Sequence, residues 1–180
     1  MVTNAGAGYS RWKDYAVTRW REDVTRDNWG TFCYIRDLDS NAFWSNTRQP
    51  ALQKGEKYEA VFAHGHVDFR TANHEIETHT EIVVSPEDDI EMRRLRISNR
   101  SSTPRTIEVT SYAEVVLAPA ASDLMQPIFS NLFVQTEIIQ HQNAILCTRR
   151  PRSAEEHPPW MCHLMTMLGK IPEAISCETD

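Results

Sequence analysis

The sequence predicts an all-β protein built as an antiparallel β-sandwich. Apolar and polar side chains alternate with a period of two in several segments, as they do in strands with one buried face. Short stretches rich in Asp, Asn, Ser and Pro separate these segments, which is typical of the turns between strands. Only residues 14–20 show the 3.6-residue apolar spacing of a helix, so we expect little helix overall.

The first expected elements form a β-hairpin. Residues 31–36 are rich in aromatic and β-branched side chains, and residues 42–45 read as the returning strand. Between them, residues 37–41 carry turn-forming Asp, Ser and Asn. Residues 49–57 then form a loop.

Longer strands are expected in the middle of the chain, over residues 58–70, 74–84 and 90–99. Within the second of these strands, we expect one face to be buried against the core, and its members are Ile76, Thr78, Thr80, Ile82 and Val84. Residues 99–104 make a turn into a further strand over residues 105–117, which we expect to lie in the middle of its sheet.

The remainder of the chain contains less regular signals. Residues 118–127 carry two prolines and are expected to form an irregular loop. Strands are expected over residues 128–139, 144–148 and 160–168.

Composition limits the possible functions. A chain of 180 residues with a net charge of −6 fits one globular domain and argues against a general nucleic-acid binder. No apolar run is long enough to span a bilayer and no signal peptide is visible, so we expect a cytoplasmic protein. Four widely spaced cysteines without a CxxC pair suggest reduced thiols, and no phosphate-binding motif or other cofactor signature is present. We therefore expect no cofactor.

Histidines raise a possible metal site. His64 and His66 share one face if residues 58–70 form a single strand, and His74 and His79 follow on the next segment. One interpretation is a cupin-like metal enzyme. The alternative, which we favour, is a row of exposed histidines on a polar strand face without a metal.

Tryptophan and arginine gather near the start of the chain. Indole faces stack on the C–H faces of sugar rings, and guanidinium groups bond to hydroxyls or phosphate. The same residues could instead be core anchors and partners of nearby carboxylates. The candidate residues for carbohydrate binding, or for an interface with another domain, are Trp12, Arg19, Trp20, Arg21, Trp29, Arg36, Trp44 and Gln49. No residue is a catalytic candidate, because no carboxylate pair or nucleophile motif stands out.

An ordered series of segments carries a family resemblance. It runs through residues 1–12, 18–23, 29–37, 43–50, 76–78, 84–89, 110–117 and 149–153. Together these segments resemble glycoside hydrolase family 94, formerly glycosyltransferase family 36, and within it the phosphorylase-like part of cyclic β-1,2-glucan synthases. One departure is Gln126, where the family often has a histidine before the proline.

The resemblance implies a β-supersandwich related to galactose mutarotase. In the family this domain precedes an (α/α)6 barrel that holds the catalytic acid and is absent from residues 1–180. We therefore expect one incomplete β-sandwich domain, truncated at its C-terminal end, that is not catalytic alone. Its implied partners are β-glucan, the missing barrel and a second copy in a homodimer, with any membrane contact made by other parts of a full-length synthase. The open alternatives are a free-standing carbohydrate-binding module and the cupin-like enzyme.

Overall fold

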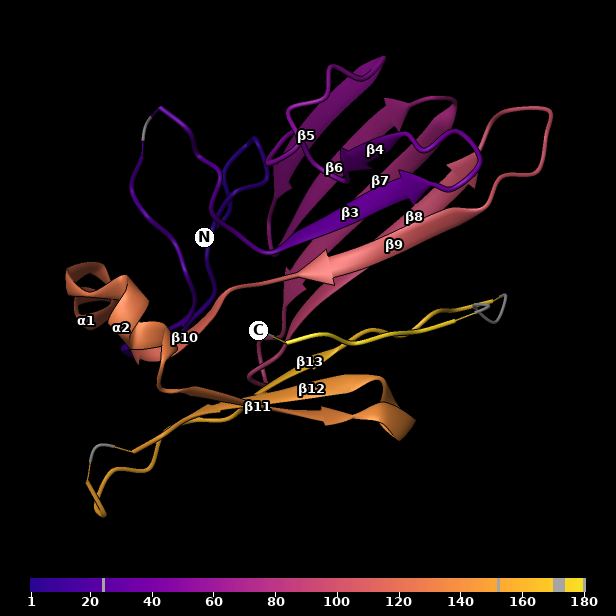
Figure 1. Ribbon diagram of the computed structural model, residues 1–180. Helices are drawn as coiled ribbons and strands as arrows, with labels where there is room; N and C mark the ends of the chain where they lie inside the picture. The colour runs from indigo at the N-terminus through magenta and orange to yellow at the C-terminus, as the bar shows by residue number, and fades with distance from the viewer. Residues whose placement is uncertain (24, 152, 170–173, 180) are drawn as a thin grey trace. The chain divides into compact units, whose positions relative to one another are not determined.

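The computed structural model describes residues 1–23, 25–151, 153–169 and 174–179. The chain divides into two compact units. The first unit comprises Met1–Ser10 and Trp20–Glu114, and the second comprises Arg11–Arg19 and Val115–Asp180. Antiparallel strands dominate both units, as the sequence predicted (Figure 1). No helix in the described ranges is long and apolar enough to cross a bilayer.

A four-stranded antiparallel sheet forms one layer of the first unit. Its strands are β5 (Lys57–Ala63), β6 (His66–Asn73), β7 (Ile76–Val84) and β8 (Glu91–Asn99), in that order. On β7 the alternation is confirmed for Ile76, Thr78, Thr80 and Ile82, which are buried, but the prediction is wrong for Val84, which is 63% exposed at the end of the strand. The prediction of a single strand over residues 58–70 is wrong. The chain reverses at His64 and Gly65, where Gly65 has a φ of +85° that favours glycine.

A three-stranded sheet packs on that layer. Its order is β4 (Phe43–Ser45), β3 (Phe32–Asp37) and β9 (Ile107–Tyr112), which confirms the predicted hairpin. Ile35 and Trp44 from this sheet form one core cluster with Ile76 of β7, and all three are 0% exposed. This cluster lies between the two sheets, so the first unit is a small sandwich (Figure 1).

The prediction of one central strand over residues 105–117 is wrong. The segment divides into β9 and β10 (Val115–Pro119), which pair with different sheets. Strand β9 lies at the end of its sheet and Val109 is half-buried, so neither is central. The alternation of β9 ends after Tyr112, and the division into two units falls between Glu114 and Val115.

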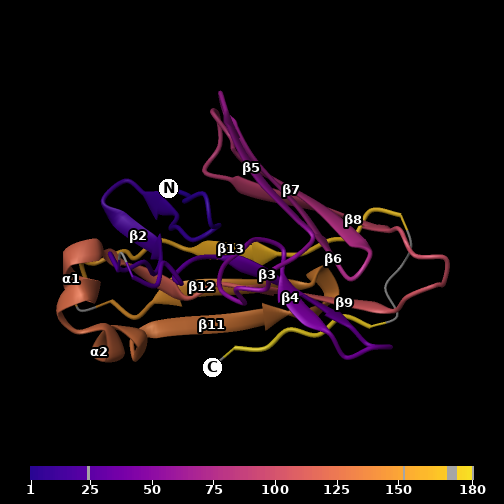
Figure 2. The same cartoon turned by 90° about the horizontal axis from the view of Figure 1, so that it is seen from above.

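The second unit holds two three-stranded sheets. One has the order β1 (Arg11–Trp12), β2 (Tyr15–Thr18), β10. The helical spacing of residues 14–20 is therefore misleading, because backbone pairing with β1 and β10 makes this segment a strand. Figure 2 shows the strands of the other sheet side by side, and these are β11 (Val134–Ile139), β12 (Ala144–Arg149) and β13 (Met161–Leu164).

Short helices occupy segments for which the sequence predicted loop or strand. Helix α1 (Ala120–Met125) lies in the predicted loop, and α2 (Pro127–Asn131) replaces the first part of the predicted strand over residues 128–139. Proline at the first position of α2 explains the difference, because its fixed φ suits a helix start. A 3₁₀ turn, η1 (Gln140–Gln142), joins β11 to β12.

Candidate functional site

A hollow in the first unit contains two of the predicted residues. The guanidinium carbon of Arg21 lies 4.8 Å from the ring centre of Trp29, in a cation–π arrangement. The hollow has a volume of about 590 Å³. We call it the Arg21–Trp29 hollow, and its lining is Arg21, Glu22, Asp23, Arg26, Asn28 and Trp29. Its mixture of indole, guanidinium and carboxylate suits a ligand that offers both C–H faces and hydroxyls.

Local hydrogen bonds shape the loop around this hollow. The Oδ1 atom of Asp23 accepts hydrogen bonds from the Thr25 hydroxyl at 2.6 Å and the Thr25 backbone N–H at 2.9 Å. These bonds lower the pKa of Asp23, so its carboxylate stays ionised at neutral pH. Gln49 is buried beside the loop and donates from Nε2 to the carbonyl oxygen of Arg26 at 2.5 Å. Gln49 therefore holds the loop that lines the hollow.

Trp20 and Trp12 lie in different units and are half-buried. Trp20 packs against Tyr9 within the first unit, with ring centres 5.6 Å apart. Trp12 belongs to β1 of the second unit, where the ammonium of Lys13 lies 4.0 Å from its ring centre. A sugar-binding role for Trp12 or Trp20 remains a prediction.

Arg19 and Trp44 are buried, each in its own unit. Arg19 is 4% exposed and makes a bidentate ion pair with Asp123, at 2.9 Å from Nε and 2.7 Å from Nη2. Its Nη2 also donates to the Asn131 side chain at 2.5 Å. The indole of Trp44 is 0% exposed in the sandwich core. Neither side chain is accessible to a ligand, so the interpretation as core and ion-pair anchors fits both.

Arg36 lines a second hollow. Of the residues around this hollow, only Arg36 was predicted from the sequence as a binding candidate. The hollow has a volume of about 390 Å³ on the three-stranded sheet, lined by Tyr34, Arg36, Asn41, Phe43, Glu108 and Thr110. Sequence reasoning did not select Tyr34 or Phe43. The signal that could have found Tyr34 is its spacing of two from Arg36, which puts both side chains on one face of β3.

The histidines do not form the expected pair. His64 lies in the β5–β6 turn, so the prediction that His64 and His66 share a strand face is wrong. Instead, Asp68 faces His79 with Nε2 at 2.7 Å and His66 with Nε2 at 3.4 Å, and the bond to His79 lowers the pKa of Asp68. Within the described ranges, no three or more His, Cys, Asp or Glu side chains are arranged to hold a metal ion.

Comparison with known proteins gives a match along the whole chain. The family described as "Glycosyl hydrolase 94, supersandwich domain" matches residues 1–180. The chain is 37% identical over 180 residues to the cyclic beta-(1,2)-glucan synthase NdvB of Rhizobium meliloti (strain 1021), covering all of this chain and 6% of that protein. It is 32% identical over 128 residues to the N,N'-diacetylchitobiose phosphorylase of Vibrio furnissii, covering 68% of this chain and 16% of that protein. The N,N'-diacetylchitobiose phosphorylase of Vibrio proteolyticus is 31% identical over 128 residues, again covering 68% of this chain and 16% of that protein.

Proposed function

Because this chain belongs to glycosyl hydrolase family 94 as its supersandwich domain, we propose that it is the accessory β-sandwich of an enzyme that processes β-glucans. In this role the domain supports a catalytic module, and its Arg21–Trp29 hollow borders the bound sugar. The observation that carries the proposal is the family match over residues 1–180, together with 37% identity to a cyclic glucan synthase over the same length.

The electrostatics of the described carboxyl groups agree with an accessory role. An inverting enzyme that acts on a glycosidic bond needs a general acid, which is a carboxyl group with a raised pKa. The carboxyl groups whose pKa clearly departs from the ordinary value are all shifted downward, and they are Asp23, Asp37, Asp68 and Glu91. A lowered pKa keeps each of these four carboxyl groups ionised at neutral pH, so these four are not prepared as general acids.

Partners and location are finer parts of the same proposal. β-Glucan and the catalytic module are the proposed partners, and a homodimer is the proposed assembly. We assign the domain to the cytoplasm because its cysteines are free, with any membrane attachment made by other parts of a full-length synthase; the free cysteines are Cys33, Cys147, Cys162 and Cys177. Sedimentation of the purified chain across a concentration series tests the homodimer.

Exchange of the matching segment tests the accessory role. This chain, inserted in place of the matching segment of the Rhizobium meliloti synthase, should preserve cyclic β-(1,2)-glucan synthesis, whereas deletion of the segment should abolish it. A deletion variant as active as the intact enzyme would contradict the proposal. Independently, the purified chain should release no glucose 1-phosphate from β-1,2-linked glucose oligosaccharides and inorganic phosphate above a no-enzyme control.

A further inference from the structure

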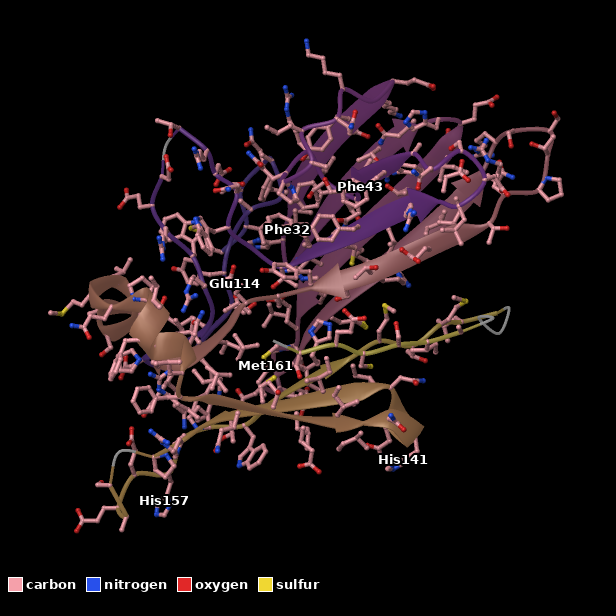
Figure 3. The ribbon with its side chains drawn as sticks, viewed as in Figure 1. Phe32, Phe43, Glu114, His141, His157 and Met161 are labelled. Carbon is pink, nitrogen blue, oxygen red and sulfur yellow. The ribbon has the colours of Figure 1, made fainter. Side chains whose placement is uncertain are left out.

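Aromatic side chains gather on the face of the three-stranded sheet that points away from the sandwich core. The ring centres of Tyr34 and Phe43 are 5.4 Å apart with their planes 22° from parallel, and the ring of Tyr112 lies 6.2 Å from that of Tyr34. Phe43 is 46% exposed and Tyr112 is 43% exposed. Figure 3 labels Phe43 on this sheet. Large aromatic rings left open to solvent side by side indicate a binding surface.

Strand register fixes this surface. Arg36 of β3 lies opposite Phe43 on one neighbouring strand and Glu108 on the other, while Tyr34 lies opposite Thr110. Residues directly opposite each other in antiparallel strands project from the same face of the sheet. The other face is anchored in the core by Ile35 and Trp44, so the exposed side chains have a rigid base. We call the set lining the second hollow the Tyr34 face: Tyr34, Arg36, Asn41, Phe43, Glu108 and Thr110.

One polar group of the Tyr34 face is held in a fixed orientation, and several others can form further hydrogen bonds. The Nε and Nη2 atoms of Arg36 both donate to Oδ1 of Asn41, at 3.0 and 2.7 Å, which fixes the guanidinium orientation. The Tyr34 hydroxyl, the Glu108 carboxylate and the Thr110 hydroxyl bond to no other residue in the described part of the chain. Burial raises the pKa of Tyr34, so its phenol remains a neutral hydrogen-bond donor.

We propose that the Tyr34 face binds a β-linked hexopyranoside chain at a second sugar site, apart from the Arg21–Trp29 hollow. This proposal rests on the proposed function. Phe43 and Tyr34 can pack against the C–H faces of a pyranose ring. Arg36, Glu108 and Thr110 can form hydrogen bonds with its hydroxyl groups.

Charge and size favour a sugar. One cation and one carboxylate leave the lining without net charge, which suits a neutral polyol better than an anionic ligand. The hollow of about 390 Å³ also lies in the range of ~300–1,000 Å³ found for small-molecule sites.

Calorimetric titration of the purified chain with a β-1,2-linked glucose tetrasaccharide tests the proposal. Phe43→Ala should raise the dissociation constant by about tenfold, and Glu108→Gln should raise it severalfold. Trp29→Ala, measured in parallel, reports on binding at the Arg21–Trp29 hollow. The matched control is Phe62→Ala, which removes a ring that is 53% exposed on β5 of the other sheet. Phe43 and Phe62 both lie at exposed positions, so neither variant should unfold the chain. Thermal melts of each variant check this.

Each other outcome overturns the proposal without deciding the accessory role. Affinity lost in Trp29→Ala but kept in Phe43→Ala would assign sugar binding to the Arg21–Trp29 hollow alone. Absence of binding by the unmodified chain would exclude the Tyr34 face as a sugar site. A dimer in sedimentation that Phe43→Ala dissociates, without sugar binding, would make the face an interface between copies. The segment exchange in the synthase is read separately, so failure of the accessory role remains distinguishable.

Discussion

Strand β7 and the segment of α1 and α2 bury opposite kinds of side chain. On β7, Ile76 and Ile82 face inward with two threonines, while Glu77 points to solvent. In the two helices, the only buried residues are Asp123 and Ser130. The large apolar side chains there are mostly exposed: Leu124 60%, Met125 82%, Ile128 85%, Phe129 55% and Leu132 72%. The helices are thus polar inside and apolar outside.

Buried arginines explain this inversion. Arg19 pairs with Asp123, and Arg149 donates from Nη1 to the Ser130 hydroxyl at 3.3 Å and to the carbonyl of Val116 at 3.0 Å. A buried guanidinium needs partners, so the helices turn their polar residues toward it. Hydrophobic patterning therefore predicts which face of an element is buried where apolar burial decides, as on β7, and fails where a buried charge decides.

Arg19→Ala should lower the free energy of unfolding more than the substitutions described below, because it removes the buried cation that pairs with Asp123 of α1. Removing one partner of a buried ion pair leaves the Asp123 carboxylate buried without its cation, which costs about 3–5 kcal/mol. Urea unfolding of the purified chain measures this loss. The control is Arg100→Ala, because the pair of Arg100 with Glu77 is exposed, and its loss should cost under ~1 kcal/mol. Equal effects of the two variants would contradict the inverted packing.

Ile76→Ala should test the opposite case, burial of an apolar side chain in the sandwich. Ile76 is 0% exposed between Ile35 and Trp44, so truncation should cost about 2–5 kcal/mol through lost burial and a cavity. The matched control is Ile90→Ala, because Ile90 is 57% exposed and should contribute little. Denaturant midpoints of both variants give the comparison. A small effect of Ile76→Ala would place the core elsewhere.

Asp37→Asn should reveal a pH-dependent contribution in the first unit. Asp37 forms an ion pair with Arg105 and accepts hydrogen bonds from Ser40 at 2.6 Å and Asp39 at 3.0 Å. The Arg105 bond, with these others, holds the pKa of Asp37 far below its ordinary 3.8.

This shift fixes the direction of the pH effect. The ionised form stabilises the fold fully above pH 3.8, and the contribution declines as pH falls toward the folded-state pKa. The stability difference between wild type and Asp37→Asn should therefore shrink in acid, measured by urea unfolding from pH 7 downward. Asp89→Asn, in an exposed turn, is the control. A difference constant with pH would show that charge is not its source.

The sequence predicted most of the strands but not where the chain reverses within them. The alternation over Ile76 to Ile82 predicts β7 because each buried residue occupies every second position. Sequence reasoning missed the reversal at Gly65, because the turn has only two residues and the segments on both sides of it favour strand. It selected Trp44 and Arg19 as possible ligand contacts, because residue type does not distinguish a buried anchor from an exposed platform. Tyr34 and Phe43 meet only through strand register, which one sequence does not specify.

Ile128→Ser should have the smallest effect on stability and tests directly whether the apolar side of the helices faces solvent. The side chain is 85% exposed on α2, so its loss should change the free energy of unfolding by no more than about 0.5 kcal/mol. The same change should weaken any self-association, because it removes an apolar group from an uncharged, solvent-facing surface. The buried Val116 of β10 is the contrasting position, where serine should cost several times more. Sedimentation and urea unfolding of both variants separate the two effects. If Ile128→Ser destabilises the second unit as much as Val116→Ser, then the apolar side of the helices belongs to the core, and the inversion described above is wrong.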